Sequence, residues 1–299
     1  MRSQILALLL VFASGCAHRP APRTADTTDA GALVARGRAA LAAGDADTAV
    51  DCIETALLID PLLADPQTSA ELFQTRMMAG KYRLALSTAE DIARQAPDRA
   101  TSYFYLGLAH LWLRHYRPSV AAFERALDFQ SYPTLTRFYL GMAHGARGNR
   151  EQQDRAWERA VEEYERILTA NPRSSETLMD LARLLLLWEH SVERVGGLLE
   201  TASQTLAGME AAAPPHGVLR LEILQGIHRY RKGEPAAALA ALTTAIGRER
   251  LPSRAELAEV YWFSAKAAEA GGKHSLGKTL LARARETDPA SPLFSRLTR

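Results

Sequence analysis

The residues that could carry chemistry in this sequence are scattered. Among the eight His, His110, His115 and His144 come nearest to a cluster. No His-Glu-x-x-His, Cys-x-x-Cys or Gly-x-Ser-x-Gly segment occurs, so the usual signatures of metal, redox and acyl-transfer sites are missing. Gly196-Gly197 and Gly271-Gly272 lack the strand and the Lys-Ser/Thr pair of a phosphate-binding loop. We therefore predict no enzyme activity, no cofactor and no metal site.

Other polar and reactive groups have simpler explanations. Glu162, Glu163 and Glu165 lie among Arg residues of one polar stretch, where opposite charges four positions apart form solvated pairs. Cys52 falls on an apolar helical face, where a thiol is usually buried and inert. The formal net charge of +2 is nearly neutral, whereas a nucleic-acid surface concentrates Lys and Arg. We expect no nucleic-acid partner.

The N-terminus has the composition of a secretory signal. Arg2 supplies positive charge, Ile5–Phe12 an unbroken apolar run, and Ala13–Gly15 small residues directly before Cys16. The apolar run is too short for a membrane span, which needs about 20 residues. Residues 1–15 are therefore predicted to be a removable signal peptide.

The segment Phe12–Cys16 resembles the bacterial lipobox, in which the Cys becomes the acylated first residue of the mature chain. The resemblance implies that Cys16 carries palmitate and more than one acyl chain, which anchors stably. Ala13 departs from the usual Leu of this motif. Ala17 replaces the Asp that marks inner-membrane retention, which indicates the periplasmic face of the outer membrane. The alternative is ordinary cleavage near Gly15, which leaves Cys16 as a thiol.

A fixed period dominates the rest of the chain. After a flexible tether, residues 16–31, the pair Leu106-Gly107 recurs 34 positions later as Leu140-Gly141. Each pair is followed by a bulky residue, Phe123 or Trp157, that lies three positions before an Ala. Self-similarity at such a period indicates one supersecondary unit copied several times. A stacked array of this kind makes a binding surface.

From Ala32 onward the pattern resembles the tetratricopeptide repeat, a helix A and a helix B joined at a Gly turn. Small residues stand where the two helices cross, and a Pro closes the unit. The resemblance implies an all-α, right-handed solenoid of about seven helix-turn-helix units over residues 32–299. Well-fitting units cover 32–170, a degenerate unit without the turn Gly covers 175–210, and two units cover 218–289.

Three alternatives stay open for this architecture. The interruption at residues 211–217 would either kink one solenoid near units four to six, which we favour, or separate two arrays. A generic helical bundle rich in Ala and Leu is the third possibility. No segment alternates apolar and polar residues as a strand does, so no strands are expected. His110 and His144 occupy equivalent positions in two repeats, which indicates a packing role.

Helix A segments line a concave groove in this family, and its groove positions can be transferred unit by unit. A partner protein or peptide is the implied ligand, because repeated aromatic, Met and Arg side chains would form an apolar patch. The alternative is that a tightly closed superhelix makes these positions ordinary core, above all Leu111 and Ile223, while Met179, Leu187 and Ile227 are further groove positions. The predicted groove residues are Met77, Met78, Phe104, Leu108, Trp112, Phe138, Met142, Arg183, Tyr230, Arg231, Trp262 and Lys266.

The combination of a lipobox with this repeat implies a lipid-anchored periplasmic scaffold. Such lipoproteins hold another protein and assist the assembly or localisation of an envelope complex, such as a pilus or secretin system. The alternative is an adaptor for polysaccharide-export or peptidoglycan enzymes. An enzyme in its own right would need a catalytic constellation that the sequence lacks.

Overall fold

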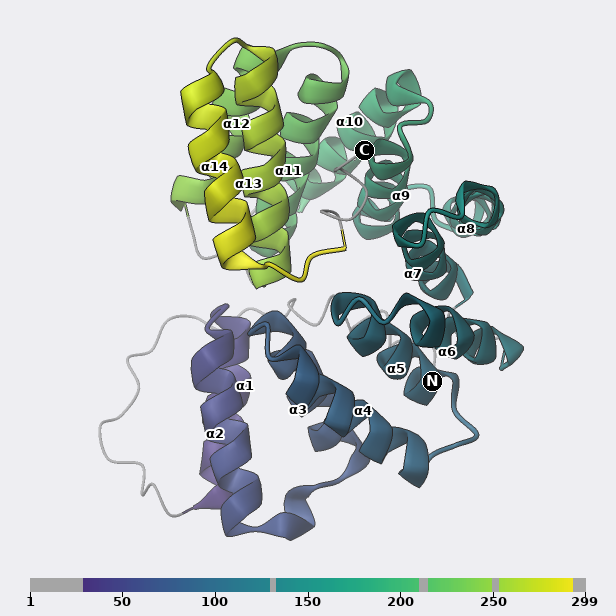
Figure 1. Ribbon diagram of the computed structural model, residues 1–299, viewed down its shortest axis with the longest axis vertical. Coiled ribbons are helices and arrows are strands. Elements are labelled where there is room, and N and C mark those ends of the chain that lie inside the picture. Colours follow the sequence, from purple (N-terminus) through teal and green to yellow (C-terminus); the bar gives the residue numbers. More distant parts are fainter. Residues whose placement is uncertain (1–28, 130–132, 210–214, 249–252, 293–299) are drawn as a thin grey trace. The chain divides into compact units, whose positions relative to one another are not determined.

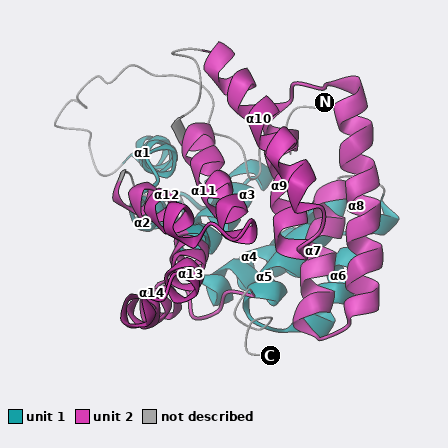
Figure 2. Ribbon diagram, turned by 90° about the horizontal axis from the view of Figure 1, so that it is seen from above, with its two compact units in different colours: residues 1–132, 250–256 teal, residues 133–249, 257–299 magenta. Residues whose placement is uncertain are grey.

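A computed structural model describes residues 29–129, 133–209, 215–248 and 253–292 (Figure 1). Cys16, the predicted signal peptide and most of the predicted tether lie outside these residues. The described part contains fourteen α-helices, one short 3-10 helix and no strand. Two compact units divide the chain (Figure 2): unit 1 is residues 1–132 with 250–256, and unit 2 is residues 133–249 with 257–299. The boundary falls between predicted repeats three and four.

Unit 1 consists of three helix pairs whose helices are similar in length. Consecutive helices pack against one another, and a Pro begins α3, the position where its missing N–H matters least. The elements are α1 (Ala30–Ala42), α2 (Ala46–Ile59), the 3-10 helix η2 (Pro61–Leu63), α3 (Pro66–Met78), α4 (Tyr82–Gln95), α5 (Ala100–Trp112) and α6 (Tyr116–Asp128).

Unit 2 continues the pattern with longer helices. The 21 residues of α8 and the 17 of α10 exceed the 13 or 14 residues of the α-helices in unit 1. Helix α11 begins at Pro215, three residues before the predicted start of the sixth repeat. The elements are α7 (Pro133–Ala146), α8 (Arg150–Ala170), α9 (Ser175–Trp188), α10 (Val192–Gly208), α11 (Pro215–Arg231), α12 (Pro235–Arg248), α13 (Arg254–Ala270, whose first three residues are counted with unit 1) and α14 (His274–Thr287).

Small residues on helix A face large residues on helix B, as the repeat pattern requires. A methyl group on Gly107 of α5 would lie 2.5 Å from the ring of Phe123 on α6. Gly226 of α11 lies in the same way against Leu242 of α12, at 2.8 Å. The missing side chain lets the two helix axes approach, and the large partner fills the crossing.

In the second repeat the two sizes are exchanged. Phe73 of α3 stands where the next repeat has Gly107, and Ala89 of α4 stands where it has Phe123. Both Phe73 and Ala89 are buried, and the Phe73 ring stacks on Tyr105 of α5 with centroids 4.5 Å apart. The small residue that the sequence pattern lacks in α3 is thus supplied by α4.

The turn inside a repeat requires one residue in the left-handed conformation. Gly44, Gly80, Gly148, Gly233 and Gly272 take it with φ between 72° and 81°, a region that costs glycine little.

Non-glycine residues take over this task in two repeats. Arg114 has φ 60° in the third, and in the fifth, which lacks the Gly, Glu189 and Ser191 have φ 63° and 50°. The degenerate repeat keeps its turn by straining two residues, each by roughly 1 kcal/mol.

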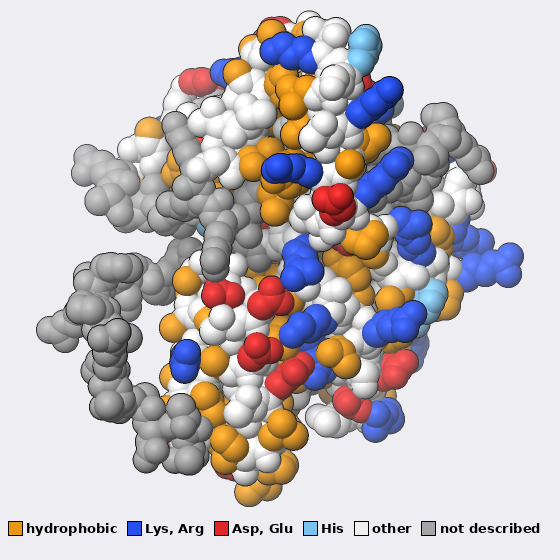
Figure 3. Space-filling view, turned by 60° about the vertical axis from the view of Figure 1, so that its left-hand side comes forward, with side chains coloured by type: hydrophobic (Ala, Val, Ile, Leu, Met, Phe, Trp, Pro, Cys, Tyr) orange, Lys and Arg blue, Asp and Glu red, His pale blue; other side chains and the backbone are white. Residues whose placement is uncertain are grey.

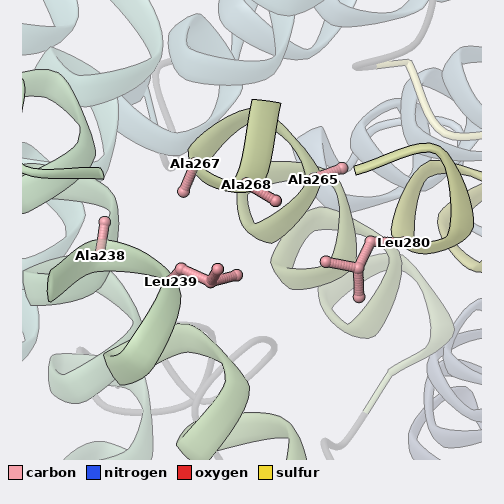
Figure 4. Close-up of a cluster of buried hydrophobic side chains, with 6 residues drawn as sticks. All are labelled: Ala238, Leu239, Ala265, Ala267, Ala268 and Leu280. Atoms are coloured by element: carbon pink, nitrogen blue, oxygen red, sulfur yellow. The ribbon is translucent and has the colours of Figure 1, made fainter. Parts of the chain in front are cut away.

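Ala residues allow the last helices to pack closely (Figure 4). Ala265, Ala267 and Ala268 of α13 form one buried cluster with Leu239 of α12 and Leu280 of α14. Burying such faces against neighbouring helices is what stabilises each hairpin, because no hairpin can cover its own apolar side.

Candidate partner-binding surface

Ion pairs join the A helices of unit 2. Arg183 of α9 donates through Nη2 to Glu259 Oε2 of α13 at 2.5 Å. On the same helix Asp180 accepts from Arg220 of α11. Glu259 is only 6% exposed, so its charge depends on Arg183 for compensation. These residues hold three A helices together by charge, where the sequence pattern indicated an apolar groove.

Glu176, one turn before Asp180 on α9, shares this polar environment. Burial raises the pKa of Glu176, the negative charge of Asp180 adds to the shift and Arg220 opposes it, which together bring the pKa to about 7. Burial likewise raises the pKa of Tyr164 on α8 well above its ordinary value. Because Glu176 titrates near neutral pH, the cluster formed by Glu176, Asp180 and Arg220 can change its net charge there.

Phe138 of α7 contacts this charged cluster through Arg183. The guanidinium of Arg183 stands 5.7 Å from the ring centre, within range of a cation–π interaction. The backbone carbonyl of Phe138 accepts a hydrogen bond of 2.9 Å from Trp157 Nε1 of α8. With 3% of its surface exposed, Phe138 is covered by its own chain.

A second group of predicted residues forms a basic-aromatic cluster, which we define as Tyr230, Arg231, Trp262 and Lys266. Phe263 lies at its centre, with its ring 6.2 Å from that of Tyr230 and 4.7 Å from that of Trp262. The Arg231 guanidinium lies 5.7 Å from both the Tyr230 and Phe263 rings, and the Lys266 ammonium lies 5.8 Å from the Trp262 ring.

The cations of this cluster keep capacity for further bonds. Arg231 Nη1 pairs with Glu189 at 2.9 Å, while Arg231 Nε is buried without a hydrogen-bond partner among the described residues. Lys266 pairs with Glu269 at 3.0 Å and is half-buried. A group of aromatic rings beside two half-buried cations is suited to bind a peptide segment that carries carboxylates.

In unit 1 the predicted groove residues are distributed over core and edge. Phe104 is 6% exposed and its ring lies 6.0 Å from that of Phe123. Leu108 is buried too, and Met78 packs against a cluster formed by Ala46, Val50 and Ala79. Met77 and Trp112 are half-buried.

The structure thus separates the predicted groove residues into two classes. The expected apolar patch is not open at Phe104, Leu108, Phe138, Met142 and Trp262, because neighbouring helices cover these side chains to at least 92%. The core alternative describes Leu111, which is buried, whereas Ile223 is half-buried; the groove positions Met179, Leu187 and Ile227 are buried as well. A role in binding stays a prediction, and it is best placed on the half-buried members: Met77, Met78, Trp112, Arg183, Tyr230, Arg231 and Lys266.

The histidines occupy packing positions. His144 is 7% exposed and His110 is half-buried. Burial lowers the pKa of both rings, and the charge of neighbouring His115 or Arg147 lowers it further. Within the described ranges no three His, Cys, Asp or Glu side chains are grouped to hold a metal ion. No described helix combines the length and the hydrophobicity that crossing a membrane requires.

Sequence reasoning missed the polar members of the unit 2 cluster: Glu176, Asp180, Arg220 and Glu259. A signal was present on α9, where Glu176, Asp180 and Arg183 follow at spacings of four and three on one helical face. Most other residues of this helix are apolar and buried. Charges on such a helix indicate partners on other elements, although the spacing does not say which.

Comparisons with known proteins agree with this architecture. Residues 71–135 match the family model described as "Tetratricopeptide repeat". The chain is similar to the structure of the APC/C hetero-tetramer Cut9-Hcn1, with a TM-score of 0.53 and 12% identity, over 86% of this chain and 46% of that one. It is also similar to a Rap protein complexed with Competence and Sporulation Factor, with a TM-score of 0.50 and 12% identity, over 88% and 77%.

A tetratricopeptide repeat protein from Parabacteroides merdae ATCC 43184 matches with a TM-score of 0.46 and 14% identity, over 86% of this chain and 93% of that chain. No curated protein matches. At these identities the likeness to solved structures shows the fold alone. Together with the helix pairs described above, it confirms the predicted all-α fold of the tetratricopeptide-repeat solenoid type.

Proposed function

We propose that this protein is a lipid-anchored scaffold of the bacterial cell envelope that binds another protein through its repeats. The observation that carries the proposal is the basic-aromatic cluster, because its two cations and the Tyr230 ring are half-buried and lie on the A helices of adjacent repeats. One protein of this fold, the Rap protein, forms a complex with Competence and Sporulation Factor, which supports a binding role.

The anchor in this proposal comes from the sequence. Acylation of Cys16 would hold the repeats at a membrane, with the periplasmic face of the outer membrane as the proposed site. The role is to assist assembly or localisation of an envelope complex, with a pilus or secretin system as the favoured example. Mass spectrometry of the mature N-terminal peptide tests the anchor: an unmodified Cys16 would contradict it.

Partner binding is tested by affinity capture from native envelopes. We expect Tyr230→Ala with Lys266→Glu to lose the partner that the parent chain recovers, because ring and cation are both removed. The exposed Lys278→Glu on α14 is the matched charge control and should retain it. Equal recovery by all three chains, at unchanged melting temperature, would remove this surface from the proposal.

A further inference from the structure

The end of the first helix pair carries the most exposed large apolar side chains of the described structure. Leu62 of η2 is 92% exposed, Leu58 of α2 is 84% exposed and the adjacent Ile59 is 48% exposed. We call these three residues the apolar corner. Figure 3 shows hydrophobic side chains gathered at the lower end of unit 1, where α2 passes into η2. Large side chains exposed so fully and so close together are typical of interaction sites.

The repeat itself does not require apolar residues at this turn. The corresponding connections contain Ala96-Pro97-Asp98-Arg99 after α4, Asn171-Pro172-Arg173-Ser174 after α8 and Asp288-Pro289-Ala290-Ser291 after α14. Each of these has a charged or polar residue where the first has Leu62 or Leu63. The apolar corner is therefore a local feature of the first repeat.

The apolar corner lies where the chain enters the fold. Ala30 and Leu33, at the start of α1, are in one buried cluster with Ala56 near the end of α2, and Leu63 packs against that cluster. Figure 1 shows the start of α1 and the end of α2 at the same end of this helix pair. The twelve residues between Cys16 and Asp29 can span at most about 40 Å, so a lipid on Cys16 keeps this end near the membrane.

The charges around the apolar corner decide which kind of surface it fits. No Lys or Arg occurs between Arg38 and Arg76, whereas Asp60 and Asp65 flank Leu62. Both carboxylates accept hydrogen bonds from the backbone, Asp60 from Leu62 N at 3.0 Å and Asp65 from Thr68 N at 2.7 Å. An anionic surface would be repelled, while a neutral one could accept the leucines without electrostatic cost.

We propose that the apolar corner inserts into the interfacial region of an electrically neutral lipid surface and orients unit 1 on it. This inference rests on the proposed acylation of Cys16, since the acyl chains supply the attachment and the apolar corner supplies the orientation. Amphipathic segments enter the headgroup boundary to about 5–10 Å, a depth that leucines at a helix end can reach.

The test uses the acylated full-length protein reconstituted in zwitterionic phosphatidylcholine vesicles that contain nitroxide-labelled acyl chains. A fluorescent thiol probe is placed at Leu62→Cys or, as the matched control, at Leu84→Cys in a Cys52→Ala background. Leu84 is 46% exposed and lies near the start of α4, in the same unit. The start of a B helix is at the opposite end of its helix pair from the end of a B helix, where the apolar corner lies. The readouts are co-flotation with vesicles and probe quenching.

We expect quenching at position 62 to exceed that at position 84 by about fivefold or more. Adding Leu58→Ser should reduce the quenching at 62, and anionic phosphatidylglycerol should reduce it as well. Equal quenching at the two positions in a protein that floats overturns the inference and leaves the anchor intact. A protein that does not float overturns both. Shielding of position 62 from iodide in detergent, rising with protein concentration, would show a second copy there and also overturns it.

Discussion

Arg183, which is half-buried, forms an ion pair with the buried Glu259 although 76 positions separate them in the chain. They belong to α9 and α13, the A helices of the fifth and seventh repeats, so the contact joins two repeats that are not neighbours in the chain. Such a contact requires the A helices of unit 2 to lie close to one another. This explains why Met179 and Ile227, at positions that line a groove in open arrays, are 3% and 1% exposed.

Removing one partner of this pair should destabilise the protein strongly. Glu259→Gln is expected to lower the free energy of unfolding by about 2–4 kcal/mol, because the Arg183 guanidinium would lose the carboxylate that compensates its charge. Replacing both residues, Arg183→Met with Glu259→Leu, should recover most of the loss. Urea unfolding followed by circular dichroism measures the difference.

The control for that prediction is the exposed pair formed by Arg155 and Glu151 on α8. Arg155→Met should change stability by less than about 0.5 kcal/mol, because both side chains are mostly in water. A loss as large as that of Glu259→Gln would mean that burial does not govern these pairs.

Glu176 should make stability depend on pH in an unusual direction. Its pKa is raised from 4.5 to about 7 in the folded protein, so the folded state binds the proton more tightly than the unfolded state. Stability from this group is present below about pH 4.5 and decreases as the pH rises to about 7.

Glu176→Gln removes this dependence. Allowing for solvent screening, we expect the variant to be more stable than the parent by about 1 kcal/mol at pH 8 and nearly equal to it at pH 5. Unfolding midpoints at the two pH values measure this, with the exposed Glu158→Gln of α8 as control. A variant that is less stable at pH 8 would contradict the assigned environment of Glu176.

The crossing of α5 and α6 should tolerate no added methyl group. Gly107→Ala is expected to cost about 2 kcal/mol or more, because the new Cβ would lie 2.5 Å from the Phe123 ring. Gly197→Ala, inside α10 with nothing within 4 Å, should instead stabilise by about 0.5–1 kcal/mol through helix propensity. Melting temperatures that change in the same direction would refute the crossing geometry.

The turns offer a reciprocal pair of substitutions. Gly233→Ala meets no neighbour within 4 Å, so its expected cost of about 1 kcal/mol comes from the backbone at φ 78° alone. Ser191→Gly relieves the same kind of backbone strain at φ 50° and should stabilise the protein by about 0.5 kcal/mol. Thermal unfolding of both variants tests this; a stabilised Gly233→Ala would disagree with it.

Sequence periodicity predicted the helices well because packing within a repeat is local. The partners of Gly107 and Gly226 stand sixteen positions further on, and one period contains both members of each crossing. The positions on the inner face could not be predicted in the same way. Whether Phe138 is open or covered depends on Arg183 and on the curvature of the array, which no spacing within one repeat records.

The charged contacts were hidden from the sequence for a related reason. Asp180 and Arg220 are forty positions apart, and nothing in either neighbourhood identifies the other. The fifth repeat shows the limit most clearly: the missing turn Gly indicated a degenerate unit, yet Glu189 and Ser191 adopt the left-handed conformation and the helix pair forms.

The exchanged sizes of Phe73 and Ala89 relative to Gly107 and Phe123 restrict how these repeats can be recombined. A chimera that joined α3 to α6 would bring two phenyl rings to one crossing, and one that joined α5 to α4 would leave a hole between a hydrogen and a methyl group. Duplication or shuffling of this chain must therefore transfer intact hairpins, since half a repeat has no interchangeable counterpart.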